Sequence, residues 1–385
     1  MLMLRTITEI EFLQKGTGRN LGFSFDFVNE FECTNSWVDL TNQCKITFPK
    51  NVYVKSLTGE KIPLGGTNKD VQVDTLFHRG DYVSISMGYY RYSNGIETKE
   101  ISTVFQGYIS KVASKKPIVL ECEDNMWLLK QTPCTPKTFG ANDTLENYIS
   151  SLISPLGFTV NLTTQTNLKG LIVTNETVAQ LLARLRKDYH LEAYFKGNEL
   201  RVGSLVYLPS DNVGKPVWEF IFQQNIISDE LSFQRKDDIK LSAVCNSVVT
   251  KVNGTNKKGA SKTKTERLSV LVYTDKNGEF KYIEKQQGVD FPANDEGERR
   301  TLFFPNITTT KELFDRGVNE LKKYYYTGFK GKFVTFVIPY ITLGDNIILR
   351  DKLMPDRDGK YKVRSVKYSG GVNGHRQEIE LDYKL

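Results

Sequence analysis

The stretch that decides the fold begins at residue 76 and reads Leu76-Phe77-His78-Arg79-Gly80-Asp81-Tyr82-Val83-Ser84-Ile85-Ser86-Met87-Gly88. After Asp81, apolar residues alternate with small polar ones, which is the period-two pattern of a half-buried strand. A polar turn at residues 93–95 follows, and two more strand patterns lie at residues 105–109 and 118–122. Residues 76–130 therefore predict one compact β-unit.

The C-terminal stretch repeats this order of elements. Gly344-Asp345 precedes an apolar strand pattern at residues 346–349, and a turn follows at residues 356–359. Residues 377–383 then alternate, with acidic side chains on the outer face. A Gly-Asp pair before a strand is common in β-proteins, so the shared order of elements carries the argument. It predicts two small β-barrels of one design within a β-rich α+β, multidomain chain.

Composition agrees with a strand-rich protein of two or three domains. The chain has 385 residues, of which 11% are aromatic, and aromatic residues are favoured in strands. The net charge is +7, which permits contact with an anionic partner without requiring one.

The cysteines and the N-terminus limit the cellular setting. The five cysteines are scattered, lack a C-x-x-C pair and predict neither a disulfide framework nor a zinc site (Cys33, Cys44, Cys122, Cys134 and Cys245). A reducing assembly compartment is the matching expectation. The short apolar start Met1–Leu4 is followed at once by Arg5, so neither a signal peptide nor stable membrane insertion is predicted.

Linker and helix signals divide the chain into parts. The predicted parts are a first β-barrel domain of tube type at residues 1–130, a small α/β domain at residues 131–205, a second barrel domain at residues 206–250 and 329–385, and an insertion with a basic loop, a hairpin and a helix at residues 251–328. Capping patterns predict helices starting at Asp143 and Thr309, and apolar spacing predicts another from about Asn175. The Lys-rich segment 251–267 predicts an exposed, mobile loop.

No arrangement of residues predicts catalysis. His78, His190 and His375 are isolated, and we interpret them as structural or exposed. Nucleophile-elbow and phosphate-loop patterns are absent from the sequence. The acidic clusters lie on alternating strand positions, which favours a solvated face over a paired-carboxylate site (Glu121, Glu123, Asp124, Glu378, Glu380 and Asp382). We predict no enzyme activity and no catalytic, cofactor or metal site.

Several short motifs follow one another in an order known from another family. They are Ser36-Trp37-Val38-Asp39-Leu40-Thr41 with Ile46-Thr47-Phe48-Pro49, Phe77-x-x-Gly80-Asp81-x-Val83, Phe105-x-Gly107-Tyr108-Ile109, Glu121-Cys122-Glu123-Asp124-Asn125-Met126-Trp127, Pro339-x-Ile341-x-x-Gly344-Asp345 and Gly371-x-x-Gly374-His375-Arg376-Gln377-Glu378-Ile379-Glu380-Leu381. In this order the chain resembles the phage tail baseplate hub proteins of the late-control-protein-D-like family. That family is similar to the N-terminal hub part of VgrG, the spike of type VI secretion.

The resemblance implies a structural protein of a phage tail or related contractile injection system. It implies a homotrimeric ring with pseudo-six-fold symmetry that joins the six-fold tail tube to a three-fold spike and surrounds a central channel. The implied partners are the tail tube protein, a separate spike protein and other baseplate proteins, with DNA only passing through. The implied location is the virion tail baseplate, assembled in the host bacterial cytoplasm. A carbohydrate-binding or hydrolytic tail-associated protein is the alternative.

The repeat leads to an expectation about the residues that line the channel of the implied ring. If both β-units border the channel, Glu121 and Glu123 should face surroundings comparable to those of Glu378 and Glu380. Their negative charge would then keep passing DNA from binding to the wall.

Overall fold

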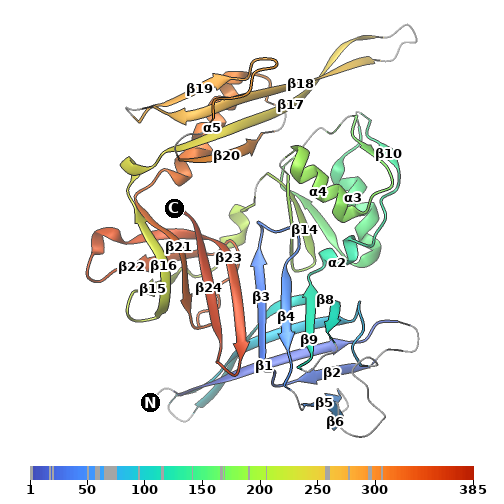
Figure 1. The fold of residues 1–385 in the computed structure, drawn as a ribbon, viewed down its shortest axis with the longest axis vertical. Helices are drawn as coiled ribbons and strands as arrows, with labels where there is room; N and C mark the ends of the chain where they lie inside the picture. Colours follow the sequence, from blue (N-terminus) through green and yellow to red (C-terminus); the bar gives the residue numbers. More distant parts are fainter. Residues whose placement is uncertain are drawn as a thin grey trace.

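The protein is β-rich and multidomain, with several separate sheets. The computed structural model describes residues 3–16, 19, 21–49, 52–56, 61–64, 76–93, 96–113, 117–140, 142–164, 168, 170–189, 191–204, 206–255, 261–275, 278–293, 297–304 and 307–385. A large sheet fills one end of the elongated molecule, and a smaller sheet covered by a helix lies at the other end (Figure 1). Among the described residues, no helix is both long and apolar enough to cross a membrane.

The large sheet combines strands from both ends of the chain. Its strands are β1 (Met3–Leu13), β2 (Gly22–Phe25), β3 (Glu30–Ser36), β4 (Gln43–Thr47), β5 (Val52–Ser56), β6 (Lys61–Leu64), β7 (Tyr82–Ser93), β8 (Ile96–Ala113), β9 (Val119–Glu123), β15 (Trp218–Ile221), β16 (Ile226–Gln234), β21 (Gly328–Thr335), β22 (Asn346–Arg350), β23 (Gly359–Gly371) and β24 (Arg376–Lys384). The main path runs β16-β21-β24-β23-β3-β4-β9-β8-β7-β1-β2-β5-β6, and β22 joins β15 to β23.

This path corrects the picture of two separate barrels. Strand β23 pairs antiparallel with β3, so the C-terminal unit continues into the N-terminal one as a single sheet. In the described part of the chain, neither unit closes into a barrel. Sequence patterns identify strands and faces but not which strands of different units meet, because pairing between distant segments leaves no local signal.

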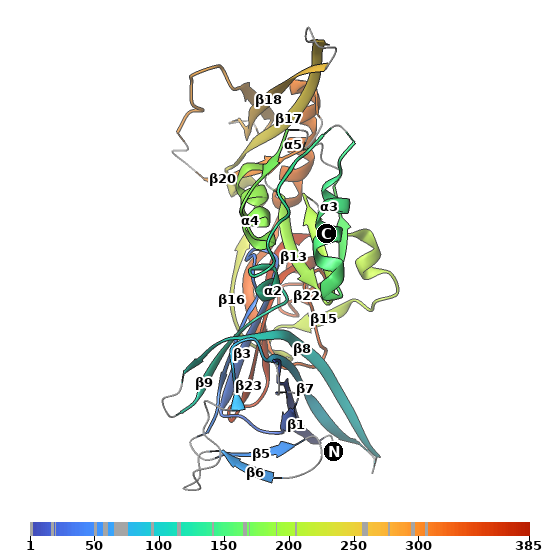
Figure 2. The same ribbon diagram turned by 90° about the vertical axis from the view of Figure 1, so that its right-hand side faces the viewer.

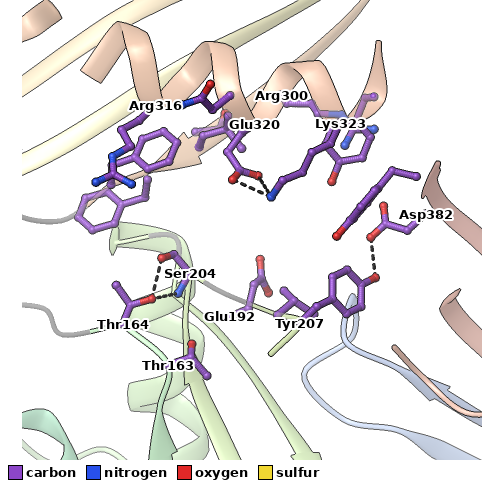
Figure 3. Close-up of a pocket in the computed structure, with 18 of the residues that line it drawn as sticks. Thr163, Thr164, Glu192, Ser204, Tyr207, Arg300, Arg316, Glu320, Lys323 and Asp382 are labelled. Atoms are coloured by element: carbon purple, nitrogen blue, oxygen red, sulfur yellow. Dashed lines mark hydrogen bonds and ion pairs between the residues drawn. The ribbon is translucent and has the colours of Figure 1, made fainter. Parts of the chain in front are cut away.

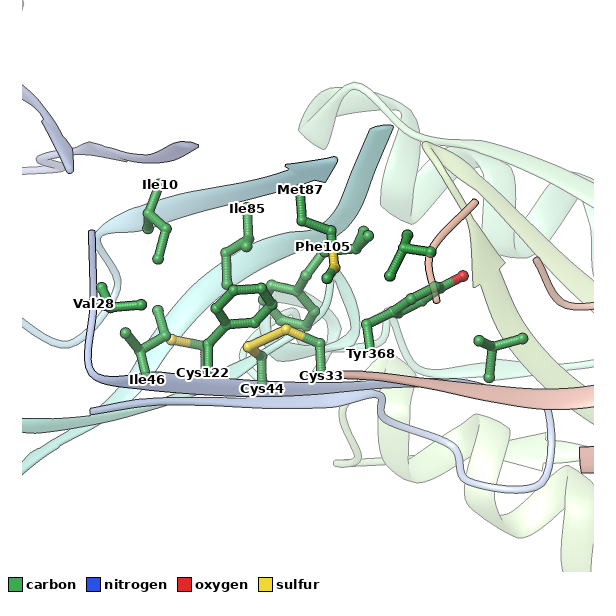
Figure 4. Packing of buried hydrophobic residues seen from close by; sticks show 14 of the residues in the cluster. Ile10, Val28, Cys33, Cys44, Ile46, Ile85, Met87, Phe105, Cys122 and Tyr368 are labelled. Carbon is green, nitrogen blue, oxygen red and sulfur yellow. A yellow bond between two sulfur atoms is a disulfide. The ribbon is translucent and has the colours of Figure 1, made fainter. Parts of the chain in front are cut away.

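The apolar faces of both units form one continuous core. Val83, Ile85 and Met87 are fully buried, which confirms the half-buried strand predicted from their alternation. They pack in one cluster with residues of the C-terminal unit, such as Tyr368 (Figure 4). Burial of apolar surface on this scale supplies most of the favourable free energy of folding.

The structure corrects the expectation about disulfides. Cys33 and Cys44 are cross-strand partners in β3 and β4, with Cα atoms 4.1 Å apart, and a disulfide joins them. Hairpin register, not sequence spacing, brings them together, so the scattered cysteine pattern did not reveal the bond. The thiols of Cys122, Cys134 and Cys245 are free and buried.

A small α/β unit lies beside the large sheet. Helices α3 (Leu145–Ile153) and α4 (Val178–Tyr189) pack near a sheet of β11 (Thr159–Leu162), β14 (Glu199–Gly203) and β13 (Glu192–Lys196). Strands β13 and β14 pair antiparallel as a hairpin. The Thr144 hydroxyl, not the predicted Asp143, caps α3 by accepting the N–H of Asn147 at 3.2 Å. Asp143 instead accepts the N–H of Gly140 and pairs with Lys137. The short helix α2 (Met126–Leu129) was not predicted.

The third unit is a four-stranded sheet with one helix. Strands β19 (Phe280–Glu284), β18 (Ser261–Thr274), β17 (Leu241–Thr255) and β20 (Glu298–Phe303) form the sheet, in that order, and α5 (Thr310–Tyr324) packs on it. Strand β17 includes residues 241–250, which we had assigned to the second barrel domain. These residues pair with β18 and β20 of the third unit. The Thr309 hydroxyl accepts the N–H of Glu312 at 3.3 Å, which confirms the predicted cap.

The structure has strands in place of the loop predicted at residues 251–267, wherever it describes that segment, while the predicted mobility stays a prediction. Residues 251–255 and 261–267 lie in β17 and β18, and Lys251 faces Lys264 across the pair. Residues 256–260 lie outside the described residues. A two-stranded arm gains its order from backbone hydrogen bonds, so the lack of apolar residues did not exclude strands.

Candidate functional site

The Gly-Asp turns before β7 and β22 share one hydrogen-bond geometry. Asp81 Oδ2 accepts the N–H of His78 at 2.8 Å, and Asp345 Oδ2 accepts the N–H of Thr342 at 2.8 Å. Each glycine has a positive φ, +93° for Gly80 and +81° for Gly344, which favours glycine at this position.

Both turns join the next long strand in the same way. Gly80 N–H donates to Ile109 O at 2.8 Å, and Ile109 N–H donates back to Asp81 O at 2.9 Å. In the second copy, Gly344 N–H donates to Val363 O and Val363 N–H donates to Asp345 O, both at 3.0 Å. Ile109 and Val363 therefore occupy equivalent positions.

The equivalence continues into the closing strands. The β8·β9 pairing shifts register between Ile109 and Lys111, and the β23·β24 pairing shifts between Val363 and Ser365. Beyond the shift, Lys111 faces Glu121, while Ser365 faces Glu380. The repeat predicted from the order of elements thus extends to single hydrogen bonds and to the same β-bulge.

A further strand pair completes each copy. Lys45 on β4 faces Glu121 and Glu32, and Lys332 on β21 faces Glu380 and Glu230. The order β3-β4-β9-β8-β7 in what we call the N-terminal half thus matches β16-β21-β24-β23-β22 in the C-terminal half. The two halves are joined at β23·β3, which we call the seam.

Charges of alternating sign cross the polar face of the sheet. We call this set the charge row, and it runs Glu230, Lys332, Glu378, Lys367, Glu32, Lys45, Glu121 and Lys111, one residue from each strand from β16 to β8. Ion pairs within it include Lys332–Glu378 at 3.2 Å and Lys111–Glu121 at 3.0 Å. Outside the row, Glu123 pairs with Lys130 at 2.6 Å. The expectation of a negatively charged face is therefore wrong, because basic side chains pair with these carboxylates.

The three histidines differ in their surroundings. His375 is buried between the halves, where Thr8 Oγ1 lies 2.8 Å from Nε2 and the Gly88 carbonyl accepts from Nδ1 at 3.0 Å. Burial lowers the pKa of His375 to about 4. This confirms the interpretation of His375 as structural. His78 is exposed beside its Gly-Asp turn, and His190 lies outside the described residues.

A polar cavity of about 850 Å³ lies where the three units meet (Figure 3). Its floor includes the pair Tyr207–Asp382, in which the phenol donates to the carboxylate at 2.5 Å. Burial raises the pKa of Asp382. Opposite this pair, Glu320 and Lys323 on α5 form an ion pair at 2.8 Å. Sequence patterns did not reveal this cavity, because its wall comes from segments distant in the chain.

Other charged side chains that line this cavity contact neighbours in their own units. Glu192 pairs with Arg186 at 2.8 Å, and the Arg300 guanidinium lies 3.5 Å from the centre of the Tyr324 ring. The first contact lies within the α/β unit and the second within the unit that contains α5. Within the described residues, no group of three or more His, Cys, Asp or Glu side chains is placed to hold a metal ion.

In sequence, the chain matches no protein-family model and no curated protein. In structure, it is similar along its length to the 43 kDa tail protein of prophage MuSo2 from Shewanella oneidensis, with 13% identity, 98% of each chain covered and a TM-score of 0.54. It is also similar to a tail protein from Neisseria meningitidis MC58, with 11% identity, 98% of this chain and 96% of that chain covered, and a TM-score of 0.53. The chain has the fold of phage tail proteins. The resemblance drawn from short motifs is confirmed at the level of the fold.

Proposed function

We propose that this protein is a structural baseplate hub of a phage tail or related contractile injection system. It forms a homotrimeric ring around a central channel and joins a six-fold tail tube to a three-fold spike. The observation that carries the proposal is the duplicated half, with its Gly-Asp turn, β-bulge and closing strand repeated at equivalent positions.

The duplication suits a protein that connects a six-fold partner to a three-fold partner. Each chain supplies two equivalent halves in fixed relative positions, because the seam pairs β23 with β3 over residues 365–371 and 30–36. Three such chains present six similar halves to a six-fold partner. The parts that are not duplicated, namely the α/β unit and the α5 unit, occur once per chain and therefore three times per ring.

The remaining features of the proposal follow from this role. The partners are the tail tube protein, a spike protein and other baseplate proteins, and DNA only passes through the channel. The division of the chain into two tube-type β-domains that share one sheet, a small α/β domain and an insertion belongs to the proposal, as does the absence of a catalytic activity. The location is the virion tail baseplate, after assembly in the host cytoplasm.

The mass of the purified protein in solution tests this function. Sedimentation equilibrium should give about three times the chain mass of 43.9 kDa at micromolar concentrations. Averaged electron micrographs should show a ring with six similar lobes around a channel. A protein that stays monomeric across the accessible concentration range would overturn the proposal.

A further inference from the structure

The seam inside the chain shows how two of these halves join edge to edge. In the seam, Ser365, Val366 and Lys367 of β23 face Ser36, Asn35 and Thr34 of β3. Strand β23 belongs to the C-terminal half and β3 to the N-terminal half. The N-terminal half contains a strand equivalent to β23, and the C-terminal half contains a strand equivalent to β3. Each half therefore has one edge strand of each kind.

The repeat identifies the two edge strands that are equivalent to the strands of the seam but lie outside it. Because Ile109 is equivalent to Val363, residues 111–113 at the end of β8 correspond to residues 365–367 of β23. Because Lys45 is equivalent to Lys332, Glu32 corresponds to Glu230, and Thr34 therefore to Ser232 of β16. The end of β8 and strand β16 are thus the counterparts of the two strands of the seam.

Both edges lack a strand partner among the residues that the structure describes. Strand β16 ends the path of the large sheet, and β8 beyond Ile109 pairs only with β9. Val112 is partly exposed, whereas its equivalent in the seam, Val366, is fully buried. On β16, the N–H of Leu231 donates to the Asp229 carboxylate of the same strand at 3.3 Å, a local substitute for a neighbouring strand. Unprotected edges of this kind favour pairing with another chain.

Charge and position suit pairing between the two edges. The charge row ends in the acidic Glu230 on β16 and in the basic Lys111 on β8, so the two edges carry charges of opposite sign. The two edges lie on opposite sides of the large sheet (Figure 1), and the turned view shows β8 and β16 in the same half of the molecule (Figure 2). Contacts between opposite sides of identical subunits are head-to-tail and close into a ring when the rotation permits.

We infer that β16 of one copy pairs antiparallel with the end of β8 of the next copy, in the register of the seam. Lys111, Val112 and Ala113 then face Gln234, Phe233 and Ser232 of the neighbouring copy. The large sheet becomes continuous around the ring, with seams inside chains alternating with equivalent junctions between chains. This inference rests on the proposed function for the number of copies, and it adds the surface and register that join them.

Cross-linking in the full chain tests the register. In the double variant Ala113→Cys/Ser232→Cys, mild oxidation should join neighbouring copies, because the new thiols are direct cross-strand partners. The two positions belong to β8 and β16, which lie on opposite sides of the large sheet (Figure 1), so such a bond forms between copies. The matched control is Ala113→Cys/Ser228→Cys. Its second cysteine replaces Ser228, an exposed serine on the same face of β16 as Ser232. The native free thiols of Cys122, Cys134 and Cys245 are buried and contribute little.

We expect on the order of tenfold more cross-linked product from Ala113→Cys/Ser232→Cys than from the control. Cross-strand partners lie ~5 Å apart, whereas a site four residues out of register lies ~13 Å further along the strand. The product should end at three linked chains on a non-reducing gel. Circular dichroism of each variant checks that it has folded. If the protein sediments as a trimer but the matched pair links no better than the control, this junction is wrong and the hub proposal stands. If the protein sediments as a monomer, both the junction and the hub proposal are wrong.

Discussion

Lys367 Nζ lies 2.8 Å from Glu32 Oε1, and this ion pair crosses the seam between the two halves of the chain. The pair is one step of the charge row, in which each residue lies between neighbours of opposite sign. Single exposed ion pairs add little stability, typically about 0 to 1 kcal/mol. The row therefore contributes more to register than to stability, because a shifted pairing would bring like charges together.

Reversing one charge in the row should expose this effect. Lys45 lies between Glu32 and Glu121, so Lys45→Glu would place three carboxylates side by side. We expect it to lower the free energy of unfolding by about 1 kcal/mol at low salt, and to lose most of that effect at high salt, where surface charges are screened. Urea unfolding at two ionic strengths measures both values. Lys45→Gln is the control, and an equal loss for both variants at both salts would contradict the charge explanation.

The glycine of the first Gly-Asp turn should be more sensitive than an unconstrained glycine. Gly80 has φ of +93°, and an added Cβ would lie 3.0 Å from Trp127 Cη2. Gly157 has a similar φ of +84° but nothing within 4 Å of an added Cβ. Gly157→Ala should cost about 1 kcal/mol from the backbone alone, and Gly80→Ala should cost about 1 to 3 kcal/mol more because of crowding. Thermal unfolding of both variants makes the comparison, and equal losses would show that Trp127 moves aside freely.

The sequence predicted features that depend on local pattern. Alternation at Val83, Ile85 and Met87 identified a buried face, and Thr309 with Glu312 identified a helix cap, since both signals lie within a few residues. The order of elements also revealed the repeat. It could not reveal the seam, since the pairing of β23 with β3 depends on segments far apart in the chain. The Cys33–Cys44 bond and the polar cavity at the junction of the three units escaped for the same reason.

The segment 251–267 shows a different limit. Its composition lacks apolar residues, and we took this as evidence against regular structure. Strand pairing overrode the composition, because β17 and β18 are anchored by buried residues nearer their other ends, such as Ala243 and Val272. A hairpin that is anchored in this way continues outward through backbone hydrogen bonds alone.

The two turn aspartates should differ in their effect on stability despite their shared geometry. Asp81 is almost fully buried and pairs with Arg19 through two oxygens at 2.9 Å. Asp345 pairs with the exposed Lys215 at 2.7 Å. Asp81→Ala leaves a partly buried guanidinium and the His78 N–H without their acceptor, so it should cost roughly 3 to 5 kcal/mol. Asp345→Ala should cost about 1 to 2 kcal/mol, mainly from the lost cap. Denaturant unfolding of both variants measures the difference, and reversal of this order would contradict the role given to burial.

The final prediction concerns the dependence of stability on pH. Burial lowers the pKa of His375 to about 4 in the folded protein, from an ordinary value of 6.5. Since the Gly88 carbonyl accepts from Nδ1, the folded state keeps Nε2 as the acceptor for the Thr8 hydroxyl, and protonation of Nε2 would remove that acceptor. Between pH 6.5 and pH 4, the unfolded chain therefore binds a proton that the folded chain does not. The stability contributed by His375 is present above pH 6.5 and is lost as the pH falls toward 4.

His375→Gln removes this titration while keeping a side chain that can donate and accept. The variant should be less stable than the natural protein at pH 7, and the difference should shrink by roughly 3 kcal/mol by pH 4. Burial also raises the pKa of Asp124 to about 7, which acts in the opposite direction over the same range. Because Asp124 is present in both proteins, its effect cancels in the difference between them. Urea unfolding at intervals from pH 4 to pH 8 measures that difference, and a difference that stays constant would show that His375 titrates alike in the folded and unfolded chains.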